Sequence, residues 1–281
     1  MTSHLLKFLF SATIVKAGIY LCGLAALLPP INSLSPSIAF AESSNKAGAT
    51  DQSPITIEAA EFLEWNQNEG TYTAKGEAFV QQSETRISAA QIIARYNADS
   101  ETRNINHLIA TGDVTYIEGE NTAKGDMLDY DLTSSYYLLT GKNASVEGPR
   151  GKMTATKSIA YDAAENANRK VTAIGKARYA TDDGRILFGD KLIAYIAADG
   201  TLKTIDAYEN TRVITTNGTE ATADKLTYVA TTALADLDGN VEIIDNENIM
   251  RGDKAKIDFD TEISRIISIP GGNRVRGTLT P

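Results

Sequence analysis

The sequence has few of the side chains that most often carry catalysis and metal binding. It has one cysteine, Cys22, and two histidines, His4 and His107. A single cysteine cannot form a disulfide within the chain. The acidic residues are scattered, so no carboxylate pair for glycoside cleavage is visible, and no phosphate-binding glycine loop precedes a helix. We therefore expect no enzymatic activity, no metal site and no cofactor.

Long hydrophobic runs are also absent. The apolar run at 17–28 has twelve residues, whereas a membrane-spanning helix needs about 20. Lys7 and Lys16 precede this run, and Pro29 and Pro30 end it. The segment closes with the small residues Ala39 and Ala41. This order is typical of a secretory signal peptide. We predict a cleavable signal peptide at 1–41, with a retained membrane anchor as the alternative.

The charge balance is acidic, with a formal net charge of −9. Removal of the signal peptide would leave 25 basic and 36 acidic residues, because the signal contains two lysines and no acidic residue. Such a surface repels nucleic acid and has no general attraction to anionic lipid head groups. Residues 42–54 are polar and predict a flexible leader, 55–269 a single ordered domain, and 270–281 a C-terminal tail.

Helical periodicity is missing from residue 55 onward, and alternation with a period of two takes its place. An aromatic residue closes one strand of each repeat at 65, 96, 130, 161, 195, 228 and 259. A second marker residue begins another strand of each repeat. This marker is glycine at 76, 112, 141, 175 and 239, and Glu209 takes its place in one repeat. Self-similarity at about 32 residues indicates a stacked array in which no unit buries its apolar face alone.

The turn-like links between these stretches predict short antiparallel strands that run across a long axis, so the fold class is all-β. Residues two apart on a strand share a face, and the repeat markers therefore form apolar columns inside the array. An ordinary sandwich core would explain these columns. However, many inward positions hold alanine, including Ala78, Ala110 and Ala177, and an interior of small residues would leave a groove.

The segment GDVTYIEGENTAKGDMLDYDLTSSYYLLTG, echoed by TATKSIAY, GDKLIAY and ATADKLTY, resembles the OstA/LptA family of periplasmic lipopolysaccharide-transport proteins. The resemblance implies an elongated, V-shaped, twisted β-jelly-roll in the periplasm that holds lipid A acyl chains inside. It also implies end-to-end assembly by strand addition, with self-association and with inner-membrane and outer-membrane transport components as partners. The phosphates of the lipid are expected to stay outside.

The columns define the candidate residues. We expect the lipid groove to be lined by Leu63, Trp65, Tyr96, Val114, Tyr116, Leu128, Tyr130, Ile159, Tyr161, Ile193, Tyr195, Leu226 and Tyr228, and Glu118 and Asp183 to lie outside it. Open sheet edges invite pairing with another chain, and the expected partner edges are Ile55, Ile57 and Ala59 at one end and Ile263, Ile266, Ile267 and Ile269 at the other. The alternatives are a membrane-anchored component of the same machine and a β-solenoid carbohydrate-active or adhesin-like protein.

Overall fold

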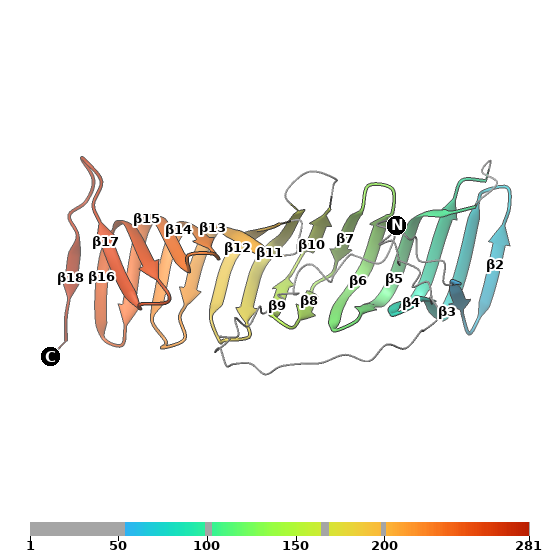
Figure 1. Cartoon of the computed structure of the whole chain (residues 1–281), viewed down its shortest axis with the longest axis horizontal. Helices are drawn as coiled ribbons and strands as arrows, with labels where there is room; N and C mark the ends of the chain where they lie inside the picture. The colour runs from blue at the N-terminus through green and yellow to red at the C-terminus, as the bar shows by residue number, and fades with distance from the viewer. Residues whose placement is uncertain (1–53, 99–102, 164–168, 198–200, 281) are drawn as a thin grey trace, which may run out of the picture.

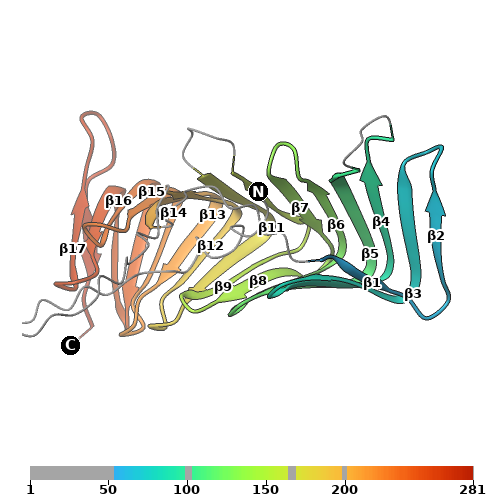
Figure 2. The same cartoon turned by 45° about the vertical axis from the view of Figure 1, so that its right-hand side comes forward.

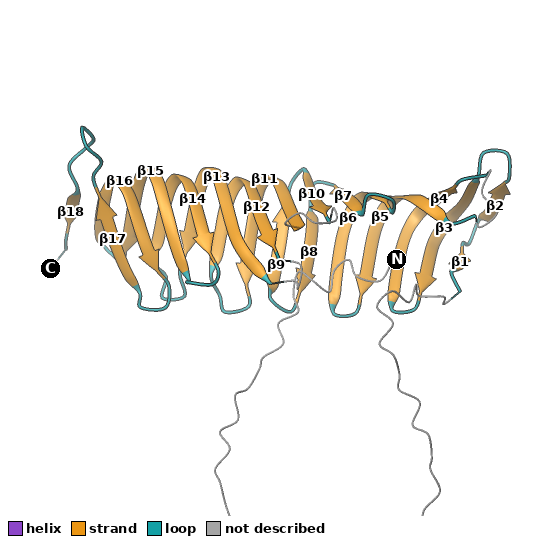
Figure 3. Cartoon of the chain, turned by 45° about the horizontal axis from the view of Figure 1, so that its top comes forward, coloured by secondary structure: helices purple, strands orange, loops and turns teal. Residues whose placement is uncertain are grey.

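The computed structural model describes residues 54–98, 103–163, 169–197 and 201–280, and every regular element in these ranges is a β-strand (Figure 3). The all-β prediction is confirmed. The predicted signal peptide at 1–41 and all of the predicted leader except Pro54 lie outside the described residues. In the described part of the chain, no helix has the length and apolar character needed to cross a membrane.

Eighteen strands follow one another along an elongated array, from the blue N-terminal end to the red C-terminal end in Figure 1. They are β1 (Thr56–Glu58), β2 (Phe62–Asn66), β3 (Thr71–Gln82), β4 (Thr85–Tyr96), β5 (Ile105–Glu118), β6 (Asn121–Asp131), β7 (Tyr136–Thr140), β8 (Ala144–Gly148), β9 (Gly151–Ala155), β10 (Ser158–Asp162), β11 (Arg169–Thr181), β12 (Ile186–Ile196), β13 (Leu202–Ile214), β14 (Glu220–Val229), β15 (Leu234–Asp245), β16 (Asn248–Asp258), β17 (Ile263–Ile267) and β18 (Arg276–Thr278).

Most of these strands are longer than the sequence predicted, because each runs through two sheets. Strand β5 has 14 residues. Its first part pairs with 91–96 of β4, its second part pairs with 85–88, and the register shifts between them. Strands β3, β6, β11, β12, β13, β14, β15 and β16 show a similar shift or change of partner within one strand. Five-residue strands occur at the centre, β7 to β10, and near the two ends, as β2 and β17.

The pairing defines two sheets. Sheet I runs from β2 through β7 and β10 to β17, and sheet II runs from β1 through β8 and β9 to β18. The long strands contribute one part to each sheet (Figure 2). All of these pairings are antiparallel. This arrangement agrees with an elongated β-jelly-roll.

Five of the long strands, β3, β5, β11, β13 and β15, bend where the second repeat marker predicted a strand to begin. Gly112 has a φ of 83° and the next residue, Asp113, has a φ of 49°. The same two-residue conformation occurs at 76–77, 175–176, 209–210 and 239–240. Two consecutive residues in this region form a β-bulge that turns the strand sharply. We call the line of bends that joins the two sheets the spine.

The alanines that the sequence placed inside the array lie beside the spine. Ala78, Ala110, Ala144, Ala173, Ala177 and Ala207 are all fully buried. Because their side chains are small, the two sheets can approach each other closely where they meet. The expectation that alanine positions leave the groove open is therefore wrong: at these positions the interior is closed.

The bends predict a position-dependent cost for adding a methyl group to glycine. A Cβ on Gly112 would lie 2.7 Å from the Cβ of Ala90, whereas a Cβ on Gly184, with a similar φ of 95°, would have no atom within 4 Å. Both alanine variants suffer left-handed backbone strain, but only Gly112→Ala clashes with the neighbouring strand β4. We expect Gly112→Ala to lower the free energy of unfolding by about 1–3 kcal/mol more than Gly184→Ala, as measured by urea unfolding. Equal losses would contradict the close contact between the bend at Gly112 and β4.

Candidate functional site

The interior between the two sheets is the candidate site, and its residues come from alternate positions on each strand. On β6, Leu128 is buried and Tyr130 packs against the core, while Asp129 between them points to the opposite face. Across the array the inward positions are Leu, Ile, Val, Ala and Tyr. The interior is therefore apolar, as the period-two pattern predicted.

Two cavities lie in this interior, away from the spine. The N-terminal cavity has a volume of about 490 Å³ and is lined by large residues that include Val80, Leu108, Tyr116, Tyr130 and Leu132. The C-terminal cavity has a volume of about 180 Å³ and is lined by Arg150, Tyr179, Thr181, Asp182, Asp183, Arg185, Ile186, Leu187, Leu202, Ile205, Val213, Leu226, Tyr228 and Phe259. The larger one falls within the range of about 300–1,000 Å³ usual for small-molecule pockets. Both cavities are therefore bounded by large side chains, in the region where the two sheets diverge.

A cluster of tyrosines around one buried carboxylate lies at the inner end of the N-terminal cavity. Glu118 is 2% exposed and accepts a hydrogen bond of 3.2 Å from the hydroxyl of Tyr116. The rings of Tyr130 and Tyr137 stack with centroids 3.8 Å apart, and Tyr161 lies next to Tyr137. Burial is the main cause that raises the pKa of all four of these tyrosines. They therefore stay neutral at physiological pH and add hydroxyl groups to an otherwise apolar path.

Most of the predicted groove residues face this interior. Tyr96, Val114, Tyr116, Leu128, Ile159, Tyr161 and Leu226 are buried in the core, and Tyr130 and Tyr228 pack against it. Tyr116 and Tyr130 line the N-terminal cavity, and Leu226 and Tyr228 line the C-terminal cavity. Their inward orientation is confirmed, while their role in lipid binding stays a prediction.

Leu63 and Trp65 lie at the uncovered N-terminal end of sheet I. They are 55% and 44% exposed. Trp65 stacks on Tyr72 and donates a hydrogen bond of 2.8 Å from its indole nitrogen to the hydroxyl of Tyr96. Tyr96 is buried in the interior, so this aromatic group continues the inward face to the open end of the array.

The predicted inward orientation of Ile193 and Tyr195 is wrong, because both residues lie on the outer face of β12. Leu192 is buried and pairs with Ala207, whereas Ile193 pairs with Asp206. The segment GDKLIAY has apolar residues on both faces. Alignment of the repeats on its aromatic residue therefore assigned the inward face to the wrong set of alternate residues. Alignment on the Gly-Asp pair of GDMLDYD matches Leu192 to Leu128 and gives the observed face. A shift of one residue moves every side chain to the other face.

The expected outside position of Glu118 is wrong, whereas Asp183 is exposed, as expected. Glu118 belongs to the buried tyrosine cluster, and Asp183 lines the C-terminal cavity. Both residues sit at or near turns with acidic, polar sequences, which indicate solvent exposure. The sequence gives no signal that these turns reach over the apolar interior.

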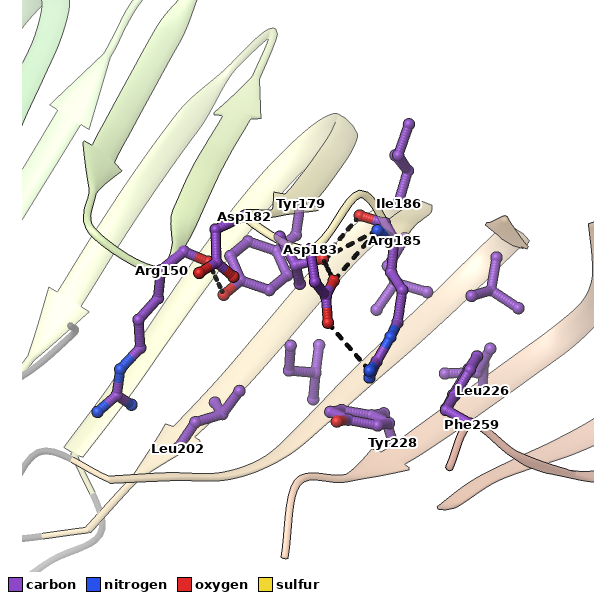
Figure 4. Close-up of a pocket in the computed structure, with 14 residues that line it drawn as sticks. Arg150, Tyr179, Asp182, Asp183, Arg185, Ile186, Leu202, Leu226, Tyr228 and Phe259 are labelled. Atoms are coloured by element: carbon purple, nitrogen blue, oxygen red, sulfur yellow. Dashed lines mark hydrogen bonds and ion pairs between the residues drawn. The ribbon is translucent and has the colours of Figure 1, made fainter. Parts of the chain in front are cut away.

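Two arginines of the C-terminal cavity were not predicted at all. Arg150 comes from the turn between β8 and β9, and Arg185 follows the turn after β11. Figure 4 shows Arg185 paired with Asp183, a contact of 2.9 Å, beside Tyr228 and Phe259. Burial raises the pKa of Tyr179, which also lines this cavity, to about 12.

The predicted partner edges lie at the two ends of the array. Among the described strands, β1 and β2 pair with β3, and β17 and β18 pair with β16. Ile55, Ile263, Ile267 and Ile269 are exposed, while Ile57, Ala59 and Ile266 pack partly against the core. Both sheets therefore present a terminal strand at each end.

Comparison with known proteins now adds the family. A model described as "LptA/(LptD N-terminal domain) LPS transport protein" matches residues 56–167 and again residues 163–263. The chain belongs to this family of lipopolysaccharide transport proteins. Among solved structures, it is similar to LptH, the LptA-homologous periplasmic component of the lipopolysaccharide transport device from Pseudomonas aeruginosa, at 13% identity over 82% of this chain and 98% of that one, with a TM-score of 0.22. No curated protein matches the chain.

The double match shows that the array consists of two family units in tandem. The units meet between β10 and β11, and there β10 pairs with β11 through five residue pairs, from Ser158–Ile174 to Asp162–Lys170. In sheet II, β9 pairs with β11 in the same way. The hydrogen-bonded sheets therefore pass from one unit to the next without a break.

The raised pKa of Tyr179 predicts a loss of stability at alkaline pH. Above about pH 10 the unfolded chain ionises this tyrosine, whereas the folded chain keeps it protonated up to a pKa of about 12. The folded state then binds more protons, so the free energy of unfolding falls as pH rises between these values. We expect Tyr179→Phe to lose less stability than the wild type between pH 9 and pH 11, as measured by urea unfolding. Parallel pH profiles would contradict a buried Tyr179 hydroxyl.

Proposed function

We propose that the protein is a periplasmic carrier that holds the acyl chains of lipopolysaccharide between its two sheets and hands the lipid along an array that bridges the inner and outer membranes. The observation that carries this proposal is the continuous apolar interior with two cavities at its open side, in a chain of a lipopolysaccharide transport family. A closed sandwich core would need no such space.

The chemistry of the interior suits acyl chains. Transfer of each CH₂ group from water into an apolar site contributes about 0.8 kcal/mol, so even a few methylenes per cavity would hold the lipid. The hydroxyls of the tyrosine cluster interrupt this lining at the inner end of the N-terminal cavity. An acyl chain could therefore move from one apolar section to the next over a short polar step.

The ends of the array support assembly into a bridge. The terminal strands leave unpaired backbone N–H and C=O groups, which another strand can satisfy. The joint between the two family units, with β10 and β9 on one side and β11 on the other, is an example within this chain of units joined by strand pairing. Because the N-terminal and C-terminal edges differ, such a contact between copies is head to tail and does not close into a two-fold dimer.

The lipid path can be tested with a photoreactive amino acid at matched tyrosines. Tyr130 and Tyr228 face the interior, whereas Tyr136 and Tyr195 lie on the outer face. We expect capture of lipopolysaccharide from the two inward positions and little from the two outward ones, since the acyl chains lie between the sheets. The readout is a band shift that reacts with antibody to lipopolysaccharide. Equal capture from both pairs would reject an interior path.

Assembly can be tested with charge at the C-terminal edge. Lysine on an edge strand opposes strand addition, and Ile174 gives a matched control because it is 39% exposed in the middle of the array, like Ile267 at the edge. We expect wild-type oligomers that grow with concentration in light scattering, with Ile267→Lys reducing them severalfold and Ile174→Lys leaving them unchanged. A wild type that stays monomeric, or equal effects of the two variants, would contradict head-to-tail pairing.

A further inference from the structure

The C-terminal cavity contains a charged group that the apolar carrier role does not use. The Nη2 atom of Arg150 is buried, and among the described residues it has no hydrogen-bond partner. An arginine side chain keeps its charge at all physiological pH values. A buried N–H without a partner costs about 1–3 kcal/mol, and more for a charged group. The site is therefore short of an acceptor.

The position of Arg150 is held by its surroundings. Its carbonyl oxygen accepts two hydrogen bonds of 3.3 Å, from the Tyr179 hydroxyl and from the backbone N–H of Asp182. Gly151 lets the turn lie against β11, since a Cβ there would be 2.1 Å from the carbonyl oxygen of Ala180. The turn is thus fixed on the cavity wall, and a long side chain from it reaches inward.

The guanidinium group lies where a head group could meet an acyl chain. Arg150 lines the 180 Å³ cavity and a smaller neighbouring one of about 30 Å³, together with Tyr179, Leu202 and Ile205 in both. Figure 4 shows it extending away from the pair that Arg185 forms with Asp183. Arg185 is therefore already neutralised by a carboxylate, whereas the Nη2 donor of Arg150 is available to an incoming anion.

We propose that Arg150 binds a phosphate group of the carried lipid, with one acyl chain of the same molecule in the adjoining cavity. This proposal rests on the proposed function and adds a specific head-group contact inside the array, where the sequence placed the phosphates outside. The forked donors of a guanidinium match phosphate oxygens, and the cavity is smaller than the 300–1,000 Å³ of a typical ligand pocket, so it takes one chain segment. The contact makes the C-terminal unit selective for a phosphorylated lipid.

The test compares two variants and three probes with the purified full chain. Arg150→Met removes the inward charge, and Arg178→Met removes a charge from the opposite face of β11, where Arg178 lies over Phe188. The probes are bis-phosphorylated lipid A, the same lipid A without phosphates, and inorganic phosphate, with affinity measured by fluorescence titration. A charge-assisted hydrogen bond predicts that Arg150→Met weakens binding of phosphorylated lipid A by about tenfold or more, with no change for the dephosphorylated lipid and none in Arg178→Met.

The other outcomes separate the proposals. An equal loss for both lipids in Arg150→Met shows a packing role and overturns the head-group contact, as does unchanged binding of the phosphorylated lipid. Binding of inorganic phosphate alone that depends on Arg150 overturns the lipid contact in favour of a free-anion site. A wild type that binds neither lipid overturns the carrier function itself. Far-UV circular dichroism and the urea midpoint confirm that each variant is folded.

Discussion

The array depends on long strands that pass from one sheet to the other, and on β3, β5, β11, β13 and β15 the crossing has two consecutive residues with left-handed backbone angles. Glycine supplies the first of these angles without strain at four of the bends. At 209–210 the pair is Glu209–Asn210, and here the side-chain amide of Asn210 donates a hydrogen bond of 2.7 Å to Asp190. Asn240 makes a similar bond of 2.8 Å to Asp224. The bends are thus fixed by local hydrogen bonds as well as by backbone freedom.

The bends determine where the interior is closed and where it is open. Beside the spine most positions hold alanine, and the sheets meet there with full burial. Two and four residues further along each strand the sheets diverge, and leucine, isoleucine and then tyrosine or phenylalanine occupy the inward positions. Even these large side chains leave cavities of about 490 and 180 Å³. One geometric feature therefore produces both a stable fold and a space for an apolar ligand.

Polar groups divide this interior into parts with different chemistry. The N-terminal cavity ends at the tyrosine cluster, with its buried Glu118. The C-terminal cavity has two arginines and two aspartates on its wall. The tandem of two family units in one chain thus contains two unlike cavities rather than two copies of one. A carrier built this way could hold different portions of one amphiphilic lipid in different sections.

The sequence by itself determined the strand class, the repeat and most of the inward residues, because alternation and a regular glycine are local signals. Leu128 and Tyr130 show this well, since a charged neighbour leaves only one possible face. At Ile193 and Tyr195 both faces are apolar, and only pairing with β13 decided between them. Tertiary structure alone placed Glu118 in the interior and Asp183 and Arg150 on the wall of the C-terminal cavity. Their positions follow from how turns fold over the diverging sheets, and no periodicity in the sequence encodes that long-range geometry.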